Sequence, residues 1–151
     1  MRIVIISPYL IPRRKEFYLE LANQGLVEGQ QFQFILIKEQ AKHRSYKIDN
    51  SDFGNRLIVM KSIQFYLRKL ELAFDIPLNS IRIVRNHEPS LIVTEGFGLA
   101  YFPVMLWARF SSVRLVLWNK SSSDISARRT LFKQTIKTIL ISFYSDFIAG
   151  G

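Results

Sequence analysis

Cysteine is absent from this chain of 151 residues, so the chain can form neither a disulfide framework nor a thiolate metal site. Long apolar runs are absent as well. The longest nearly apolar stretch covers residues 97–108, whereas a membrane-spanning helix needs about 18 residues. The apolar segment before Pro8 is too short for the core of a signal peptide and is typical of a strand. We therefore expect no transmembrane helix.

Acidic residues are also few. The chain has 12 Asp and Glu residues against 21 Lys and Arg residues, which gives a net charge of +9. Such a surface favours nucleic acid, anionic membranes or phosphorylated substrates, and charge alone does not choose among them. The apolar fraction of 48% is ordinary for a globular protein, and the length suits a single domain with a sizeable core.

The motifs of several enzyme classes are missing. His43 and His87, the only histidines, are far apart and in no ligand spacing, so we expect no metal site. No serine lies in a Gly-x-Ser-x-Gly elbow, and there is no P-loop. The first apolar run leads into Ser7, Pro8 and Tyr9 rather than into Gly-x-Gly-x-x-Gly, which argues against a dinucleotide dehydrogenase. No cofactor is expected.

Short apolar runs alternate with segments of helical period along the whole chain. Strands are predicted at residues 2–6, 31–38, 56–60, 91–94, 113–118 and 147–149. Helices are predicted at residues 13–24 with Gly25 as the C-cap, 61–74, 79–87 with Asn79 or Ser80 as the N-cap, 97–110 and 126–144. Residues 39–55 have no period and are expected to form a surface loop. This alternation predicts an α/β fold: a Rossmann-like three-layer α/β/α domain with a parallel sheet of about six strands.

In an open parallel sheet, ligands bind beyond the C-terminal ends of the strands, at the point where the strand order reverses. Three loops then become candidates: residues 7–14, 95–98 and 118–124. In the second loop, Gly96 and Gly98 let the backbone approach a ligand, and free N–H groups at a helix start hold an oxyanion. Glu95 would accept hydrogen bonds from sugar hydroxyls. The alternative interpretation is a tight turn with a solvated glutamate.

The other two loops also contain polar groups. Arg13 and Arg14 begin a predicted helix, where each cation opposes the helix dipole by roughly 0.3–1 kcal/mol. They contact a phosphate or a facing domain, or they are simply solvated. In the third loop, Asp124 or Ser126 is suited to capping the next helix, which leaves Asn119 and Lys120 as binding candidates.

A basic stripe runs along the last predicted helix. Arg129, Lys133 and Lys137 recur every four residues with no acid placed to pair with them. The stripe either lies on anionic lipid headgroups, at about 1 kcal/mol per basic residue, or forms a solvated face. The expected core face lies opposite and comprises Phe132, Ile136, Ile139, Leu140 and Phe143.

Several segments resemble a known family. The opening Arg2-Ile3-Val4-Ile5-Ile6-Ser7-Pro8-Tyr9, followed by Pro12-Arg13-Arg14, is similar to the N-terminal domain of GT-B glycosyltransferases of the group 1, family 4 type. Residues 88–96 resemble the fourth strand of that domain. Residues 114–119 and 145–151 resemble its last two strands, so the resemblance covers nearly the whole chain.

This resemblance implies a retaining enzyme with two Rossmann-like domains. The N-terminal domain would bind the acceptor, and the C-terminal domain, with its Glu-x7-Glu signature, would bind the nucleotide-sugar. We expect residues 1–151 to be the acceptor-side half, truncated or split and inactive alone, of an enzyme that transfers a sugar to a glycan or lipid-linked glycan. By resemblance, the enzyme would work in the cytoplasm, with its basic helices on the inner face of the membrane. The acceptor-side residues would be Ser7, Pro8, Tyr9, Arg13, Glu95, Gly96, Phe97, Gly98, Asn119 and Lys120.

Two other classes stay open. One is a non-catalytic subunit that completes a glycosyltransferase in trans. The other is a small basic module for nucleic acid or a membrane surface. Nucleic acid is disfavoured because Phe132, Phe143 and Tyr144 lie on the expected core face, away from the basic residues beside which bases would stack.

Overall fold

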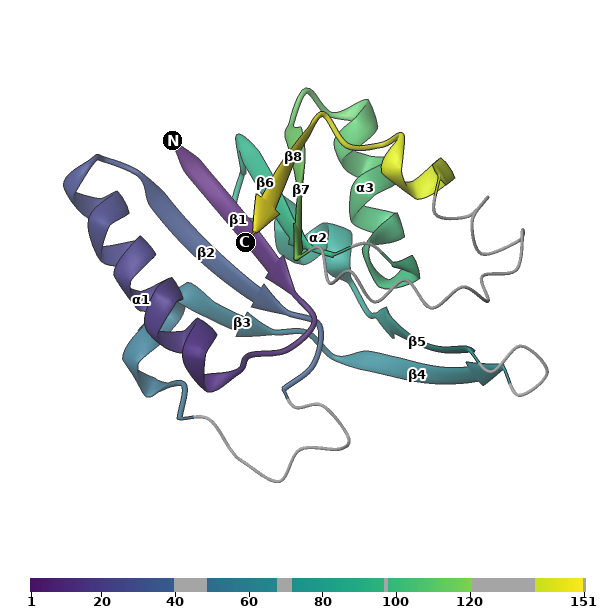
Figure 1. Ribbon diagram of the computed structural model, residues 1–151, viewed down its shortest axis with the longest axis horizontal. Helices are drawn as coiled ribbons and strands as arrows, with labels where there is room; N and C mark the ends of the chain where they lie inside the picture. The colour runs from purple at the N-terminus through teal and green to yellow at the C-terminus, as the bar shows by residue number, and fades with distance from the viewer. Residues whose placement is uncertain (40–48, 68–71, 97, 121–137, 151) are drawn as a thin grey trace.

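The architecture is a parallel sheet between two helical layers, as seen in a computed structural model that describes residues 1–39, 49–67, 72–96, 98–120 and 138–150 (Figure 1). The sheet has six strands: β1 (Arg2–Ser7), β2 (Gln31–Leu36), β3 (Leu57–Val59), β6 (Leu91–Glu95), β7 (Arg114–Lys120) and β8 (Asp146–Gly150). Their order is β3-β2-β1-β6-β7-β8, and every pair is parallel. The chain thus proceeds outward from β1 to one edge, returns beside β1 as β6, and proceeds to the other edge. The order reverses between β1 and β6.

Alternate side chains of the strands build a core on each face of the sheet. On one face, Ile3 and Ile5 pack with Tyr18 and Ala22 of helix α1 (Pro12–Val27). On the other face, the core comprises residues of β1, of helix α2 (Ser80–Arg85), of the 3-10 turn η3 (Leu99–Tyr101) and of helix α3 (Phe102–Phe110), among them Val4, Ile6, Val84, Tyr101 and Met105. The predicted Rossmann-like three-layer α/β/α class is therefore confirmed.

The prediction of a helix over residues 61–74 is wrong. The segment forms an antiparallel hairpin of β4 (Ser62–Leu67) and β5 (Leu72–Pro77), which extends away from the body of the domain (Figure 1). Ile63, Phe65 and Leu67 alternate with Ser62, Gln64 and Tyr66, so the first half of the segment fits a period of two as well as a helical period. An ion pair between Lys38, just beyond β2, and Asp75 of β5, 2.8 Å long, ties the hairpin to the sheet.

The predicted surface loop over residues 39–55 is also partly wrong. Residues 40–48 lie outside the described part of the chain, but a 3-10 helix, η1 (Ser51–Arg56), follows. Its Phe53 is only 1% exposed and packs edge-on against Phe34, with ring centroids 5.6 Å apart. A lone aromatic residue in a polar stretch has no period, so its burial is invisible to pattern analysis.

The end of α1 uses a different glycine from the one predicted. Gly25 lies inside the helix, buried beneath the ring of Phe32, where a side chain would not fit. Gly29 takes the left-handed conformation, with φ of +70°. The N–H groups of Gly29 and Gln30 bond to the carbonyls of Leu26 and Gly25, which is the Schellman pattern of a helix end.

Other boundaries differ by small amounts. Helix α2 ends at Arg85 rather than His87, and its N-cap Asn79 has φ of +58° and makes no side-chain cap bond. Of the predicted last helix, residues 138–141 are helical and residues 121–137 lie outside the described part. Within it, Leu140 is buried as predicted, but Ile139 is 52% exposed and so does not belong to the core. In the described ranges, every helix is too short or too polar to cross a membrane.

Candidate functional site

Two buried polar residues meet where the strand order reverses. The parallel register places Ile6 of β1 beside Thr94 of β6. The next residues, Ser7 and Glu95, therefore lie side by side at the C-terminal ends of these two central strands. Both side chains are buried, at 1% and 7% exposure. The sequence placed these residues in separate loops, and the register brings them together.

The Glu95 carboxylate accepts three hydrogen bonds. The Ser7 hydroxyl donates to Oε2 over 2.6 Å, the Arg14 guanidinium forms an ion pair with the same oxygen, and the Tyr18 hydroxyl donates to Oε1. In addition, the Tyr101 hydroxyl donates to the main-chain oxygen of Glu95 over 2.8 Å. Glu95 is therefore not the solvated turn residue of the alternative interpretation, and most of its carboxylate is committed to protein donors.

The surroundings of Glu95 also fix the protonation of its neighbours. Burial, reinforced by the charge of Glu95, raises the pKa of Tyr18 far above its ordinary value. The pKa of Tyr101 is raised for the same two reasons. Both hydroxyls hence stay protonated and remain donors. Since a carboxylate oxygen accepts about two hydrogen bonds, Oε2 is fully used and Oε1 keeps one site.

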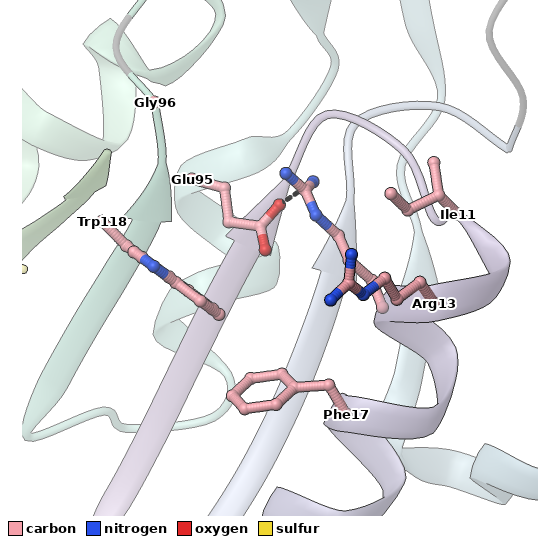
Figure 2. Close-up of a pocket in the computed structure, with 7 residues that line it drawn as sticks. Ile11, Arg13, Phe17, Glu95, Gly96 and Trp118 are labelled. Atoms are coloured by element: carbon pink, nitrogen blue, oxygen red, sulfur yellow. Dashed lines mark hydrogen bonds and ion pairs between the residues drawn. The ribbon is translucent and has the colours of Figure 1, made fainter. Parts of the chain in front are cut away.

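A pocket of about 290 Å³ opens beside this buried carboxylate. Phe17 and Trp118 form its aromatic wall, with ring centroids 5.4 Å apart and planes inclined at 57°. Phe17 is 43% exposed. Figure 2 shows Arg13, Phe17, Glu95 and Trp118 converging on one space. The full lining comprises Ile11, Arg13, Arg14, Phe17, Glu95, Gly96 and Trp118.

In the glycine turn after β6, the N–H group of Gly96 is already committed to the protein. Gly96 has φ of +84°, and its N–H donates to the carbonyl of Trp118 over 3.0 Å. Gly96 therefore contributes no free N–H group to an oxyanion. The glycine instead connects the ends of β6 and β7, and it forms part of the pocket wall.

The predicted site residues divide into three groups. Arg13, Glu95 and Gly96 line the pocket, and Ser7 supports it through Glu95. The second group, which the described lining does not include, comprises Pro8, Tyr9 and Gly98; the side chains of Asn119 and Lys120 belong with the third group, outside what the structure describes. Asn119 and Lys120 end β7 and lie in register with Ala149 and Gly150 of β8. The third group, outside the described residues, comprises Phe97 and the basic stripe of Arg129, Lys133 and Lys137.

Three members of the site were not named as binding residues from the sequence. Phe17 and Trp118 form the aromatic wall, and Tyr18 holds the carboxylate. A usable signal was present for the first and third, because Arg13 and Phe17 are four residues apart, as are Arg14 and Tyr18. Each pair therefore shares a face of α1, one turn apart. Trp118 begins the candidate loop over residues 118–124, but its contact with Phe17 depends on the pairing of β6 with β7.

The site contains no evident metal centre. Within the described ranges, no three His, Asp or Glu side chains gather in a way that would hold an ion. Comparison of the chain with models of protein families, with curated proteins and with solved structures gives no match. Function must therefore be argued from the site itself.

Proposed function

We propose that this chain is the acceptor-binding domain of a two-domain glycosyltransferase of the GT-B type, and that its pocket binds a sugar of the acceptor. One observation carries the proposal: an aromatic wall of Phe17 and Trp118 faces charged groups at the point where the strand order reverses. This is the position at which doubly wound sheets bind their ligands.

The chemistry of the lining suits a sugar. A pyranose ring has an apolar face of C–H groups, which stacks on an aromatic ring, and a rim of hydroxyls, which needs polar partners. Trp118 and Phe17 supply the apolar surface, while Arg13 and the unused site on Oε1 of Glu95 supply a donor and an acceptor. A volume of about 290 Å³ is at the small end for ligand pockets, which fits one residue of a longer acceptor.

The same lining supports the proposal that the chain does not catalyse transfer alone. Among the described residues that line the pocket, Glu95 is the only carboxylate, and three donors already occupy it. Nothing there offers a free base or a nucleotide-binding motif. In this proposal the donor sugar comes from a second domain, in the same protein or in trans.

The acceptor in this proposal is a glycan or a lipid-linked glycan at the cytoplasmic face of a membrane. The support is the net charge of +9, which favours contact with anionic headgroups. Such contact would be peripheral.

Sugar binding is testable through Trp118. In a Trp107→Phe background, Trp118 is the remaining tryptophan, so its fluorescence reports on the pocket alone. Oligosaccharides that bind should change this fluorescence. The variant Trp118→Ala has lost the reporter, so its binding is measured by saturation-transfer NMR. We expect it to bind roughly tenfold more weakly, a loss of about 1.4 kcal/mol. Trp107 packs against the core on the opposite face of the sheet, so Trp107→Phe alone should leave the NMR signal unchanged.

Two results would contradict the proposal. The purified chain should transfer no sugar from nucleotide-sugars, so measurable transfer would show that it is more than an acceptor-binding half. Salt-sensitive binding of single-stranded oligonucleotides, in the absence of any sugar binding, would instead indicate a nucleic-acid module.

A further inference from the structure

We infer that the sugar bound in this pocket carries an anionic group, a carboxylate or a phosphate, and that Arg13 holds it. This inference rests on the proposed sugar-binding function and specifies its substrate class. It starts from the three consecutive cations that begin α1, Arg13, Arg14 and Lys15.

The three cations differ in their partners. Arg14 forms an ion pair with Glu95, and Lys15 pairs with Asp52 over 2.6 Å. For Arg13 the described part of the chain provides neither an ion pair nor a hydrogen bond, and its side chain is exposed. It also lies in the first turn of a helix that has no acidic residue there, where a cation opposes the helix dipole. Stability therefore does not explain an arginine at this position.

The charge in the pocket is unbalanced. Two guanidinium groups, those of Arg13 and Arg14, face the single carboxylate of Glu95, which leaves one positive charge. The hydroxyls of Ser7 and Tyr18 already donate to that carboxylate. An anionic ligand would thus find the Arg13 guanidinium uncommitted, with donors in the forked geometry that matches a carboxylate or phosphate.

The spacing along α1 places this cation next to the aromatic wall. Arg13 precedes Phe17 by four residues, and the two share a face of the helix about one turn, roughly 5.4 Å, apart. Phe17 in turn contacts Trp118. Figure 2 shows the three side chains around one space. A sugar ring stacked on the wall would therefore extend an exocyclic acid group toward Arg13.

Three sugars test this inference by saturation-transfer NMR with the 151-residue chain: a methyl glucuronide, the matching methyl glucoside and a hexose phosphate. Inorganic phosphate has no carbon-bound protons, so its binding is measured by how well it displaces the hexose phosphate. We expect at least one of the two charged sugars to bind roughly tenfold more tightly than the glucoside. The preference should shrink as salt is added, because Arg13 is exposed. The glucuronide and the hexose phosphate distinguish a carboxylate from a phosphate.

Variants connect the preference to the residue. Arg13→Gln should abolish the preference for charged sugars over the glucoside, whereas Arg13→Lys should retain part of the preference, because the charge stays and the fork is lost. Arg109→Gln is the matched control, since it removes the same charge from the exposed last turn of α3. That turn leads into the start of β7, at the end of the sheet opposite to the pocket. Arg109→Gln should leave the preference intact.

The outcomes separate the two proposals. Equal binding of charged and neutral sugars, or a preference that persists in Arg13→Gln, overturns the anionic inference and leaves the sugar site in place. Inorganic phosphate that binds as tightly as the hexose phosphate also overturns it, because the sugar ring would then contribute nothing. Absence of binding by all sugars overturns both proposals.

Discussion

Replacing Tyr18 by phenylalanine would remove one hydroxyl from beneath the pocket and leave the ring in place. Tyr18 is fully buried, and its ring stacks on Phe34 with centroids 4.7 Å apart. Its hydroxyl donates to Oε1 of Glu95. Phenylalanine retains the stacking, so Tyr18→Phe tests one interaction: a hydrogen bond to a buried carboxylate.

Tyr101 provides a matched comparison. Its hydroxyl is also buried and also donates to Glu95, but to the neutral main-chain oxygen, over 2.8 Å. Hydrogen bonds to charged groups contribute about 1.5–3 kcal/mol, and neutral ones about 0.5–1.5 kcal/mol. We expect Tyr18→Phe to lower the free energy of unfolding by about 2 kcal/mol and Tyr101→Phe by about 1 kcal/mol. In a chain of this length, the larger loss lowers the melting temperature by roughly 4–8 °C.

Equilibrium unfolding in urea, followed by circular dichroism, measures both losses. The slope against urea should stay unchanged, since neither substitution alters the surface exposed on unfolding. If Tyr18→Phe costs no more than Tyr101→Phe, the reasoning is refuted, because the buried carboxylate would not depend on Tyr18. A double-mutant cycle with Glu95→Gln then shows whether the two side chains are coupled at all.

Two further predictions use the same unfolding assay. In Gly25→Ala the new methyl group would lie 2.6 Å from Cδ2 of Phe32, so we expect the free energy of unfolding to fall by about 1 kcal/mol despite the better helix propensity of alanine. Gly98→Ala is the control, because the space around the added methyl group is open. An equal effect of both substitutions would contradict the packing argument. Burial raises the pKa of Tyr144 from 10.0 to about 12, so the stability contributed by its neutral hydroxyl is complete below about pH 10 and is lost as the pH rises toward about 12. Tyr144→Phe should therefore flatten the fall of the unfolding free energy in that range, and an unchanged slope would count against the burial argument.

How far pattern analysis succeeds depends on whether a residue's role is local. The six sheet strands were all predicted, because buried parallel strands are short continuous apolar runs that alternate with amphipathic helices. Residues 62–67 fit both a helical period and the period of two of a strand. The pairing of Ile63 with Ile76 decided the outcome in favour of a hairpin. Nothing local distinguishes these alternatives, since Ile76 lies outside the predicted helix.

The candidate site shows the same division. The rule for open parallel sheets selected the loops that contain Ser7, Arg13 and Glu95, and the structure places all three at the C-terminal ends of the strands. The rule did not reveal that Arg14 pairs with Glu95, whereas its neighbour Arg13 has no such partner in the described residues. Adjacent residues on a helix point about 100° apart, so their partners depend on which strand lies beneath each of them.

The sequence by itself determined the fold class, the sheet strands and the end of the sheet at which a ligand is expected, because each follows from hydrophobic period and from the geometry common to doubly wound sheets. Only the tertiary structure decided that Glu95 is a buried carboxylate held by three donors and that Phe17 and Trp118 form an aromatic wall. These properties arise from contacts between residues up to 101 positions apart in the chain, from Phe17 to Trp118. Strand register and helix docking set such contacts, and neither is encoded in the neighbourhood of a single residue.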